Sequence, residues 1–362
     1  MRKAWTGLVC LAAAMSVFEA QGQGAGHGAV IDREIHSTSF AGNKIGTSPD
    51  RRFAVYLPPG YEAGDARYPV IYYLPSPFGS YRAVFEENHA AQLFDKAILA
   101  GVIGRFIVVA PDMNTPLGCS WYLNSPVTGN WEEFMFKELV PYVDANFRTL
   151  SNRDSRGIIG DEMGGYGAIR FGMTHPEIFG TVYALHPGGT GSGLLPMYFR
   201  PDWETLAHAT SLNDVHKGGF NQLFTTIFQA HLPDVNRPPL YIDLQAHKNG
   251  DTYVVDAAVT QRLRESLFLE AMIPRYAENL KSLRGFKFDW DRNDEIQDHI
   301  YATQAFTHKL NEYGIPHEAE EYNGLWGTGN WGPKGRVYTE VLPFFARTMI
   351  FPDEMEDGRA ER

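Results

Sequence analysis

Two patterns of apolar residues alternate along the chain. Short apolar runs typical of buried strands recur between longer segments in which apolar residues repeat at helical spacing. Because strands and helices alternate, the pattern predicts a doubly wound, mostly parallel sheet of the α/β class. Strands are expected at residues 34–40, 52–57, 70–74, 105–112, 157–160, 180–186, 286–289 and 317–322. Helices are expected at residues 89–100, 131–146, 164–171, 298–313 and 336–349.

One long segment interrupts this alternation. From Pro187 to about Leu283 the pattern is irregular, with two helical pieces. Because the segment falls between two expected strands, we interpret it as an insertion that covers the strand ends as a cap. With 362 residues, of which 44% are hydrophobic, the chain can form one large domain. We expect that domain at residues 23–352, with the cap at about 187–283 and a charged tail at 353–362.

The N-terminal segment has the pattern of a signal peptide. Arg2 and Lys3 precede an apolar run, and small residues around Ala20 offer a cleavage site that would make residues 1–22 the leader. The apolar run is short for a membrane span, and a buried N-terminal helix is the alternative. We therefore expect a secreted or periplasmic protein. After cleavage Cys119 is the one remaining cysteine, so no intrachain disulfide is expected.

The net charge and the aromatic content of the chain limit the kinds of partner that it is expected to bind. The net charge of -11 argues against nucleic acid and anionic membrane surfaces. The aromatic share of 13% indicates either a large core or an aromatic-lined cleft that stacks on sugars or phenolic rings. Neither a cofactor nor a resident metal is expected, and the oligomeric state is left open.

The segment from Gly157 to Ala168 carries the most informative motif. An apolar run ends at Gly160, a tight glycine turn follows, and a helix is expected from Gly164. This is the strand–turn–helix pattern of a nucleophile elbow, Gly-x-Ser-x-Gly, which exposes its central residue at the carboxyl edge of the sheet. The central residue here is Glu162 and not serine.

Several further motifs together resemble one family. They lie at residues 124–132, 138–144, 163–168, 175–180 and 342–345. Over residues 52–351 the chain is similar to the esterase D and feruloyl esterase group of the α/β-hydrolases. The resemblance implies the α/β-hydrolase fold and a family of carboxylic ester hydrolases.

The same resemblance implies where catalytic groups should stand. The family's nucleophilic serine corresponds to Glu162, its acid to Asp294, and its base histidine, which follows the last strand, to Trp326. The oxyanion loop, usually a His-Gly pair, is Pro75-Ser76 here, and proline has no N–H to donate. The resemblance therefore implies a degenerate catalytic triad.

Other residues complete the expected site. His186 ends the sixth strand of the fold and is expected beside Glu162. Substrate-binding roles are assigned to Trp326, Ser76, Met163 and Trp121, although a core position is the preferred interpretation for Trp121. Cys119 is expected to be a buried, inert side chain. Four other histidines are interpreted as surface or cap residues: His247, His299, His308 and His317.

Two hypotheses about function remain open. In the first, the protein binds an ester, phenolic or carbohydrate-linked small molecule without serine-type turnover, because nucleophile and base are both replaced. In the second, it is an active hydrolase or lyase in which Glu162 is the nucleophile, as aspartate is in dehalogenases and epoxide hydrolases, or an acid/base partner of His186 or Asp294. A metal site built from Asp161, Glu162, His186 and Asp294 is a weaker alternative.

The sequence also predicts the direction in which the pKa of Glu162 is shifted from its ordinary value. The N-terminus of the following helix favours the charged carboxylate, whereas burial and ionised neighbours such as Asp161 oppose it. In a dry pocket the opposing effects dominate, so the sequence predicts a raised pKa for Glu162.

Overall fold

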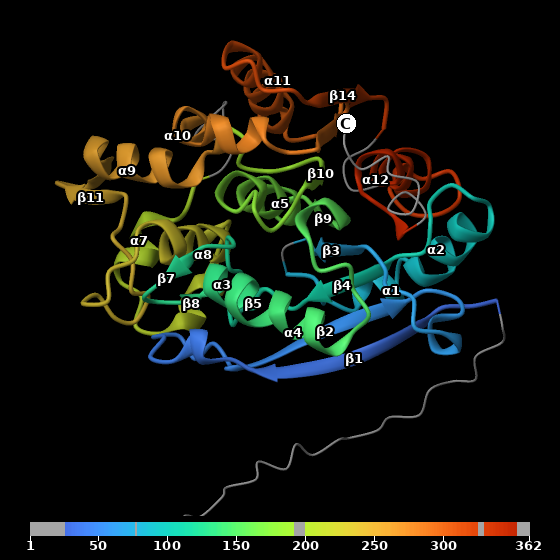
Figure 1. Ribbon diagram of the computed structural model, residues 1–362. Helices are drawn as coiled ribbons and strands as arrows, with labels where there is room; N and C mark the ends of the chain where they lie inside the picture. The colour runs from blue at the N-terminus through green and yellow to red at the C-terminus, as the bar shows by residue number, and fades with distance from the viewer. Residues whose placement is uncertain (1–25, 77, 192–199, 325–328, 353–362) are drawn as a thin grey trace, which may run out of the picture.

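The computed structural model describes residues 26–76, 78–191, 200–324 and 329–352. Its centre is an eight-stranded sheet in the order β1-β2-β4-β3-β9-β10-β13-β14 (Figure 1). The first three strands in that order pair antiparallel, and every later pair is parallel. The predicted doubly wound, mostly parallel sheet is therefore confirmed. The strands are β1 (Ala29–His36), β2 (Asp50–Leu57), β3 (Val70–Leu74), β4 (Ile107–Pro111), β9 (Arg156–Asp161), β10 (Thr181–Leu185), β13 (Gly285–Asp291) and β14 (Glu318–Tyr322).

Helices cover both faces of this sheet (Figure 1). One face carries α2 and α12, and the other carries α5 with helices from the 131–146 and 200–312 segments. The helices are α1 (Ala83–Glu86), α2 (Ala90–Leu99), α3 (Trp131–Glu133), α4 (Val140–Asn146), α5 (Met163–Thr174), α7 (Trp203–Ala207), α8 (Asn221–His231), α9 (Ala257–Leu267), α10 (Leu269–Lys281), α11 (Gln297–Glu312) and α12 (Leu342–Thr348). The described residues also form three two-stranded ribbons: β5 (Asn114–Thr115) with β6 (Gly118–Cys119), β7 (Asn124–Ser125) with β8 (Gly129–Asn130), and β11 (Ala246–Asn249) with β12 (Thr252–Val255).

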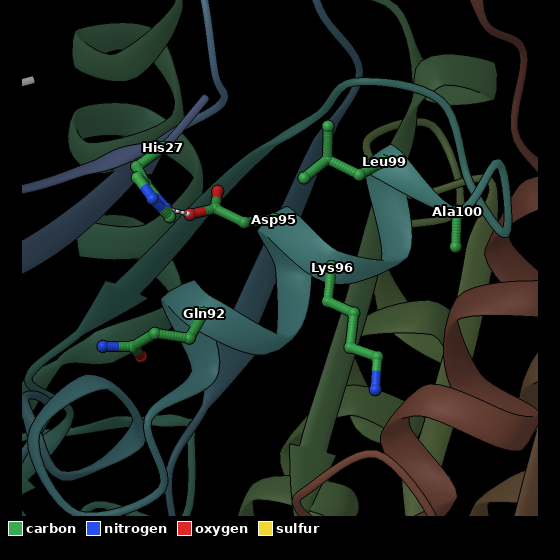
Figure 2. A pocket seen from close by; sticks show the side chains of 6 residues that line it. All are labelled: His27, Gln92, Asp95, Lys96, Leu99 and Ala100. Atoms are coloured by element: carbon green, nitrogen blue, oxygen red, sulfur yellow. Dashed lines mark hydrogen bonds and ion pairs between the residues drawn. The ribbon is translucent and has the colours of Figure 1, made fainter. Parts of the chain in front are cut away.

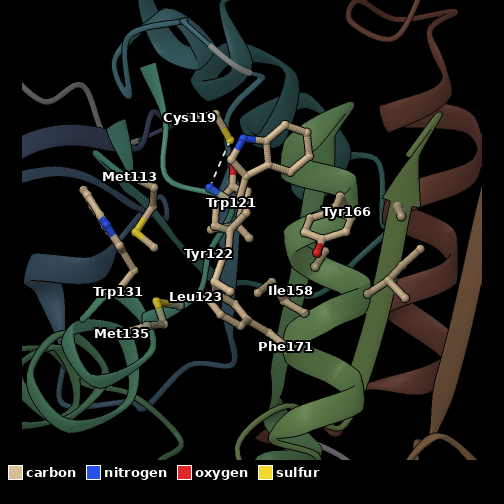
Figure 3. Close-up of a cluster of buried hydrophobic side chains, with 14 of the residues drawn as sticks. Met113, Cys119, Trp121, Tyr122, Leu123, Trp131, Met135, Ile158, Tyr166 and Phe171 are labelled. Atoms are coloured by element: carbon tan, nitrogen blue, oxygen red, sulfur yellow. Dashed lines mark hydrogen bonds between the residues drawn. The ribbon is translucent and has the colours of Figure 1, made fainter. Parts of the chain in front are cut away.

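The sheet separates two hydrophobic cores because successive strand residues point to opposite faces. Tyr72 and Ile158 belong to the core on the α5 side, whereas their neighbours Tyr73 and Ile159 belong to the core under α2 and α12. Figure 3 shows part of the first core, where aromatic and sulfur-containing side chains from the 113–135 segment pack against α5.

Some predicted elements differ in detail from the observed ones, among them the early strand and the helix at 131–146. The early strand predicted at 34–40 is wrong in its bounds, since β1 ends at His36 and the Ser37 hydroxyl caps a short helical turn at Thr38–Phe40. The helix predicted at 131–146 is present, but its middle, Phe134–Leu139, is a wide π-helical turn. Pro141 follows two residues later and lacks an N–H, which explains the altered hydrogen bonding.

The segment between β10 and β13 contains α7 to α10 and the ribbon β11–β12. Its described part packs against α5 and against the 117–125 segment: Trp121 Nε1 donates to Thr226 Oγ1 at 3.0 Å and Ser125 Oγ donates to the Gln229 carbonyl at 2.6 Å. Its role as a cap over the strand ends stays a prediction. Among the described residues, no helix is long and apolar enough to cross a membrane. The expected leader and charged tail lie outside the described residues.

Candidate functional site

The predicted elbow is present between β9 and α5. Glu162 adopts φ 52° and ψ −112°, a strained conformation for a residue with a side chain. A Cβ on Gly160 would lie 2.0 Å from the Gly164 carbonyl oxygen, so only glycine fits where strand and helix touch. The turn therefore holds Glu162 in the position in which a nucleophile elbow presents its central residue.

The Glu162 carboxyl is partly buried at this edge of the sheet. The Ser76 hydroxyl, from the loop after β3, donates a hydrogen bond to Glu162 Oε2. Burial raises the pKa of Glu162 to about 7, the negative charge of Asp161 adds to the rise, and the Ser76 hydrogen bond opposes it. This direction agrees with the raised pKa that the sequence predicts, and a carboxyl with such a pKa can either give or take a proton near neutral pH.

His186 lies beside Glu162, at the end of β10. Its side chain is almost fully buried, with Nε2 3.0 Å from Asp161 Oδ1 and Nδ1 3.0 Å from the Tyr322 hydroxyl. The Asn330 amide also lies 3.0 Å from Nε2. Burial lowers the pKa of His186, but the negative charges of Asp161, Asp289 and Glu162 together outweigh burial and raise the pKa to about 9. At neutral pH His186 is thus a cation with both ring nitrogens protonated, which suits charge stabilisation and not proton abstraction.

A second histidine approaches the site from α11. His299 Nδ1 lies 2.8 Å from Asp294 Oδ2, and Asp294 is 2% exposed. The backbone N–H of Ile296 donates to the other oxygen, Asp294 Oδ1, at 2.7 Å. The charge of His299 acts on the pKa of Glu162, which places the imidazole in the same electrostatic neighbourhood.

The surface or cap position predicted for His299 is wrong, because its side chain is 20% exposed and is oriented by Asp294. The sequence did hold a signal: His299 stands five residues after Asp294, within the first turn of a predicted helix. A carboxylate that binds Nδ1 fixes the orientation and the tautomer of the ring.

The predicted substrate-binding residues are distributed differently. Ser76 and Met163 lie at the elbow, Met163 as the first residue of α5. Trp121 is 3% exposed and packs edge-on against Tyr166 in the core shown in Figure 3, so its placement in a ligand cleft is corrected to a packing role. Cys119 is buried, and burial raises the pKa of its thiol to about 12. Trp326 lies outside the described residues.

The metal alternative gains no support from the geometry. Within residues 26–76, 78–191, 200–324 and 329–352, no three His, Cys, Asp or Glu side chains are grouped so as to hold an ion. Asp161, Glu162, His186 and Asp294 thus form no such cluster, since Asp161 pairs with His186 and Asp294 with His299.

A separate shallow hollow of about 440 Å³ lies on α2 (Figure 2). His27 Nδ1 is 3.4 Å from Asp95 Oδ2, and Asp95 also accepts hydrogen bonds from the Tyr56 hydroxyl and the Gly28 backbone. These contacts tie the N-terminal segment to α2. None of the elbow residues lines this hollow.

Comparisons with known proteins agree with this architecture. Residues 46–217 match the family model described as "Putative esterase". The chain is 27% identical over 299 residues to "Esterase Rv1288" of Mycobacterium tuberculosis, covering 79% of this chain and 54% of that protein. It is 31% identical over 156 residues to mouse S-formylglutathione hydrolase, covering 38% of this chain and 51% of that protein. The chain thus spans about half the length of these curated relatives.

Solved structures show the same fold. A ferulic acid esterase superposes with a TM-score of 0.61 at 19% identity, covering 89% of this chain and 99% of that one. An S-formylglutathione hydrolase from Agrobacterium tumefaciens superposes with a TM-score of 0.61 at 15% identity, covering 93% of this chain and all of that one, 100%. The fold is therefore that of α/β-hydrolase esterases.

Proposed function

Because the chain belongs, through residues 46–217, to the esterase family of α/β-hydrolases, we propose that it binds a small ester, phenolic or carbohydrate-linked ligand at Glu162 without serine-type turnover. One observation carries the proposal: the strained elbow presents a carboxyl group where acyl transfer by this fold needs a hydroxyl. The ligand class follows from the relatives, whose names are esterase, feruloyl esterase and S-formylglutathione hydrolase.

The neighbours of Glu162 support the absence of a serine nucleophile. The hydroxyl that contacts Glu162, Ser76 Oγ, donates a hydrogen bond to this carboxyl and not to a histidine base of the kind that activates the serine of a Ser-His-Asp triad. His186 cannot serve as that base at neutral pH, because Asp161 keeps it protonated. In the family's oxyanion position, Pro75 has no N–H to donate to a developing oxyanion.

A second candidate function is favoured by the Asp294–His299 pair. With Asp294 orienting its ring, His299 would take a proton from water, while the protonated Glu162 would give one to a leaving oxygen. Water would add to the ester carbonyl, and the alcohol would leave with the Glu162 proton. This route makes the protein a hydrolase without a covalent serine intermediate.

Two assays separate these functions. The purified protein is first treated with a fluorophosphonate and measured by intact mass; we expect no adduct, and an adduct on any serine would overturn the proposal. It is then assayed on p-nitrophenyl acetate, p-nitrophenyl butyrate and methyl ferulate, with Glu162→Gln and His299→Gln as variants. No turnover above buffer supports binding alone, whereas turnover that both variants abolish establishes the second candidate.

Export is proposed on the N-terminal pattern alone. The leader predicted at residues 1–22 would be removed on secretion. Expression of the full chain in a bacterium, followed by N-terminal sequencing of the periplasmic and culture fractions, checks this. We expect a mature chain that begins close to Gln23, and a chain that starts at Met1 in the cytoplasmic fraction would contradict it.

A further inference from the structure

A polar hollow of about 510 Å³ lies at the same edge of the sheet as the elbow. Three segments form it: the approach to β2, the loop after β3, and the turn that links β4 to β5. Ser76, which binds Glu162, and Phe78, which lines the hollow, are two residues apart in one loop. The hollow is lined by Gly46, Ser48, Arg51, Phe78, Gly79, Ser80, Tyr81, Asp112, Asn114, Thr115 and Pro116.

An exposed aromatic ring forms one wall. Phe78 is 50% exposed and has φ 62°, a conformation that is costly for a bulky residue. Its ring lies against Gly118, where a Cβ would come within 2.3 Å of the ring carbons. The chain therefore holds a large apolar side chain at the surface in a strained backbone, which a core-packing role does not explain.

The polar wall consists of Arg51, Asp112 and Asn114, and contacts within the protein hold these side chains in place. Arg51 is 4% exposed, lies over the Trp131 ring at 4.8 Å, and places Nη2 3.2 Å from Asp112 Oδ2. Asp112 Oδ1 accepts the Asn114 backbone N–H at 3.0 Å, and Asn114 Nδ2 donates to the Gly79 carbonyl at 2.8 Å. These contacts hold a carboxylate and an amide in place, so little side-chain entropy is lost when they bind a ligand.

The charge of the hollow limits the ligand. The Arg51 guanidinium is balanced by Asp112 and by two backbone carbonyls, those of Asp112 at 2.7 Å and Asn114 at 3.1 Å. Because Asp112 balances the charge of Arg51 and places a carboxylate on the wall, the hollow offers no net attraction to an anion. Hydroxyl-rich neutral ligands suit it, because carboxylates accept and amides accept or donate hydrogen bonds to hydroxyls.

We infer that this hollow is a subsite for the sugar portion of a carbohydrate-linked ligand. The apolar face of a pyranose ring packs on Phe78 while its hydroxyls bind Asp112 and Asn114. The inference deepens the proposed function, on which it rests for the role of the neighbouring site. Since β4 and β9 flank β3, the hollow and Glu162 are separated by about two strand spacings, roughly 10 Å. One ligand can therefore place its sugar in the hollow and its ester or phenolic group at the elbow.

The test measures binding of xylotetraose, maltotetraose and free ferulic acid by isothermal titration calorimetry and by amide chemical shifts. We expect at least one oligosaccharide to bind, and Phe78→Ala and Asn114→Ala to weaken it about tenfold or more, the equivalent of about 1.4 kcal/mol. Tyr301→Ala is the matched control, because Tyr301 is also 50% exposed and does not line the hollow. Thermal melting of each variant verifies that it folds.

Three results overturn the inference. In the first, neither oligosaccharide binds at millimolar concentration. In the second, an oligosaccharide binds but Phe78→Ala leaves its affinity unchanged. In the third, the binding of ferulic acid depends on Phe78 and the binding of oligosaccharide does not. A fluorophosphonate adduct would refute the proposed absence of serine chemistry without touching the sugar subsite, so the two failures are distinguishable.

Discussion

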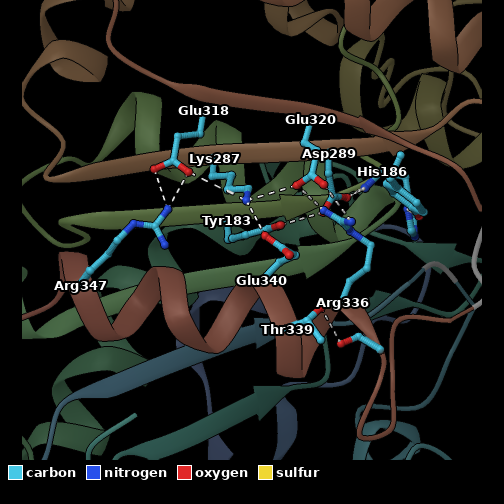
Figure 4. Close-up of polar contacts among 12 residues, drawn as sticks. Tyr183, His186, Lys287, Asp289, Glu318, Glu320, Arg336, Thr339, Glu340 and Arg347 are labelled. Atoms are coloured by element: carbon cyan, nitrogen blue, oxygen red, sulfur yellow. Dashed lines mark hydrogen bonds and ion pairs between the residues drawn. The ribbon is translucent and has the colours of Figure 1, made fainter. Parts of the chain in front are cut away.

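Two clusters of charged side chains lie at neighbouring strands, and they are built differently. In the first, around Asp289, every charge meets an opposite one (Figure 4). Asp289 is fully buried and accepts hydrogen bonds from Arg336 Nε and the Tyr183 hydroxyl, both at 2.8 Å. Arg336 also binds Glu320 at 2.8 Å, and Lys287 lies within 3.3 Å of Glu320. Such a matched network joins β13, β14 and the helix that leads into α12.

The second cluster, around Glu162, is not matched. Among the described residues Glu162 is hydrogen-bonded to the Ser76 hydroxyl and pairs with no Lys or Arg, while Asp161 beside it carries the same charge. Two described imidazoles act electrostatically on Glu162, and each is already paired with another carboxylate: His186 with Asp161 and His299 with Asp294. The comparison shows that this chain pairs buried charges with opposite charges where those charges contribute to stability. The carboxyl at the elbow, which pairs with none of the described Lys and Arg side chains, therefore indicates a functional site.

The largest expected effect comes from breaking the matched cluster. Arg336→Met leaves the buried Asp289 without its cation, so we expect the free energy of unfolding to fall by about 3 kcal/mol or more. Urea unfolding at pH 7 measures it. Arg347→Met is the control, since its exposed pair with Glu318 should contribute less than about 1 kcal/mol. Equal losses in the two variants would show that the Asp289 cluster is not the stabilising network described.

The next effect tests whether His186 belongs to the matched side of the comparison. Its pKa of about 9 lies above the ordinary 6.5, so its stabilising contribution is complete below pH 6.5 and is lost as pH rises through 9. We expect His186→Gln to lower the free energy of unfolding by about 3 kcal/mol at pH 6 and by clearly less at pH 9.5. Denaturant unfolding at both pH values measures the difference. A cost that does not change with pH would mean that the imidazole is neutral.

The smallest effect has the opposite sign and comes from the unmatched cluster. The pKa of Glu162, about 7, lies above its ordinary 4.5, so the ionised carboxylate destabilises the fold, and the effect grows as pH rises from 4.5 to 7. We expect Glu162→Gln to raise the free energy of unfolding by about 2 kcal/mol at pH 8 and to change little at pH 4. Glu278→Gln, at a side chain that is 84% exposed, is the control and should show neither effect. A destabilised Glu162→Gln protein at pH 8 would mean that partners hold the carboxylate charged.

The sequence predicted what depends on local pattern. Buried runs such as Val70–Leu74 predicted their strands, and the glycines around Glu162 predicted the elbow, because strand and helix periods and close glycine packing are written in neighbouring residues. His299 was misplaced because its position depends on how α11 packs beside β13, which no local pattern encodes. Trp121 was assigned to the cleft for the same reason, since its contact with Tyr166 joins segments far apart in sequence.

The polar hollow likewise could not be predicted from local sequence patterns. Its walls come from residues 46–51, 78–81 and 112–116, and nothing in any one segment predicts a site. The exposure of Phe78 and the orientation of Asp112 by Arg51 emerge only when β2, β3 and β4 lie side by side.

The protonation state of Glu162 is the most direct test of the account. Protein labelled with ¹³C at glutamate side-chain carboxyls is titrated by NMR, and the resonance absent from Glu162→Gln is assigned to Glu162. The account predicts a midpoint near pH 7, well above the ordinary 4.5, from a carboxyl that burial and Asp161 keep protonated. A midpoint at or below 4.5 would contradict it, because the carboxylate would then be a satisfied charge like that of Asp289.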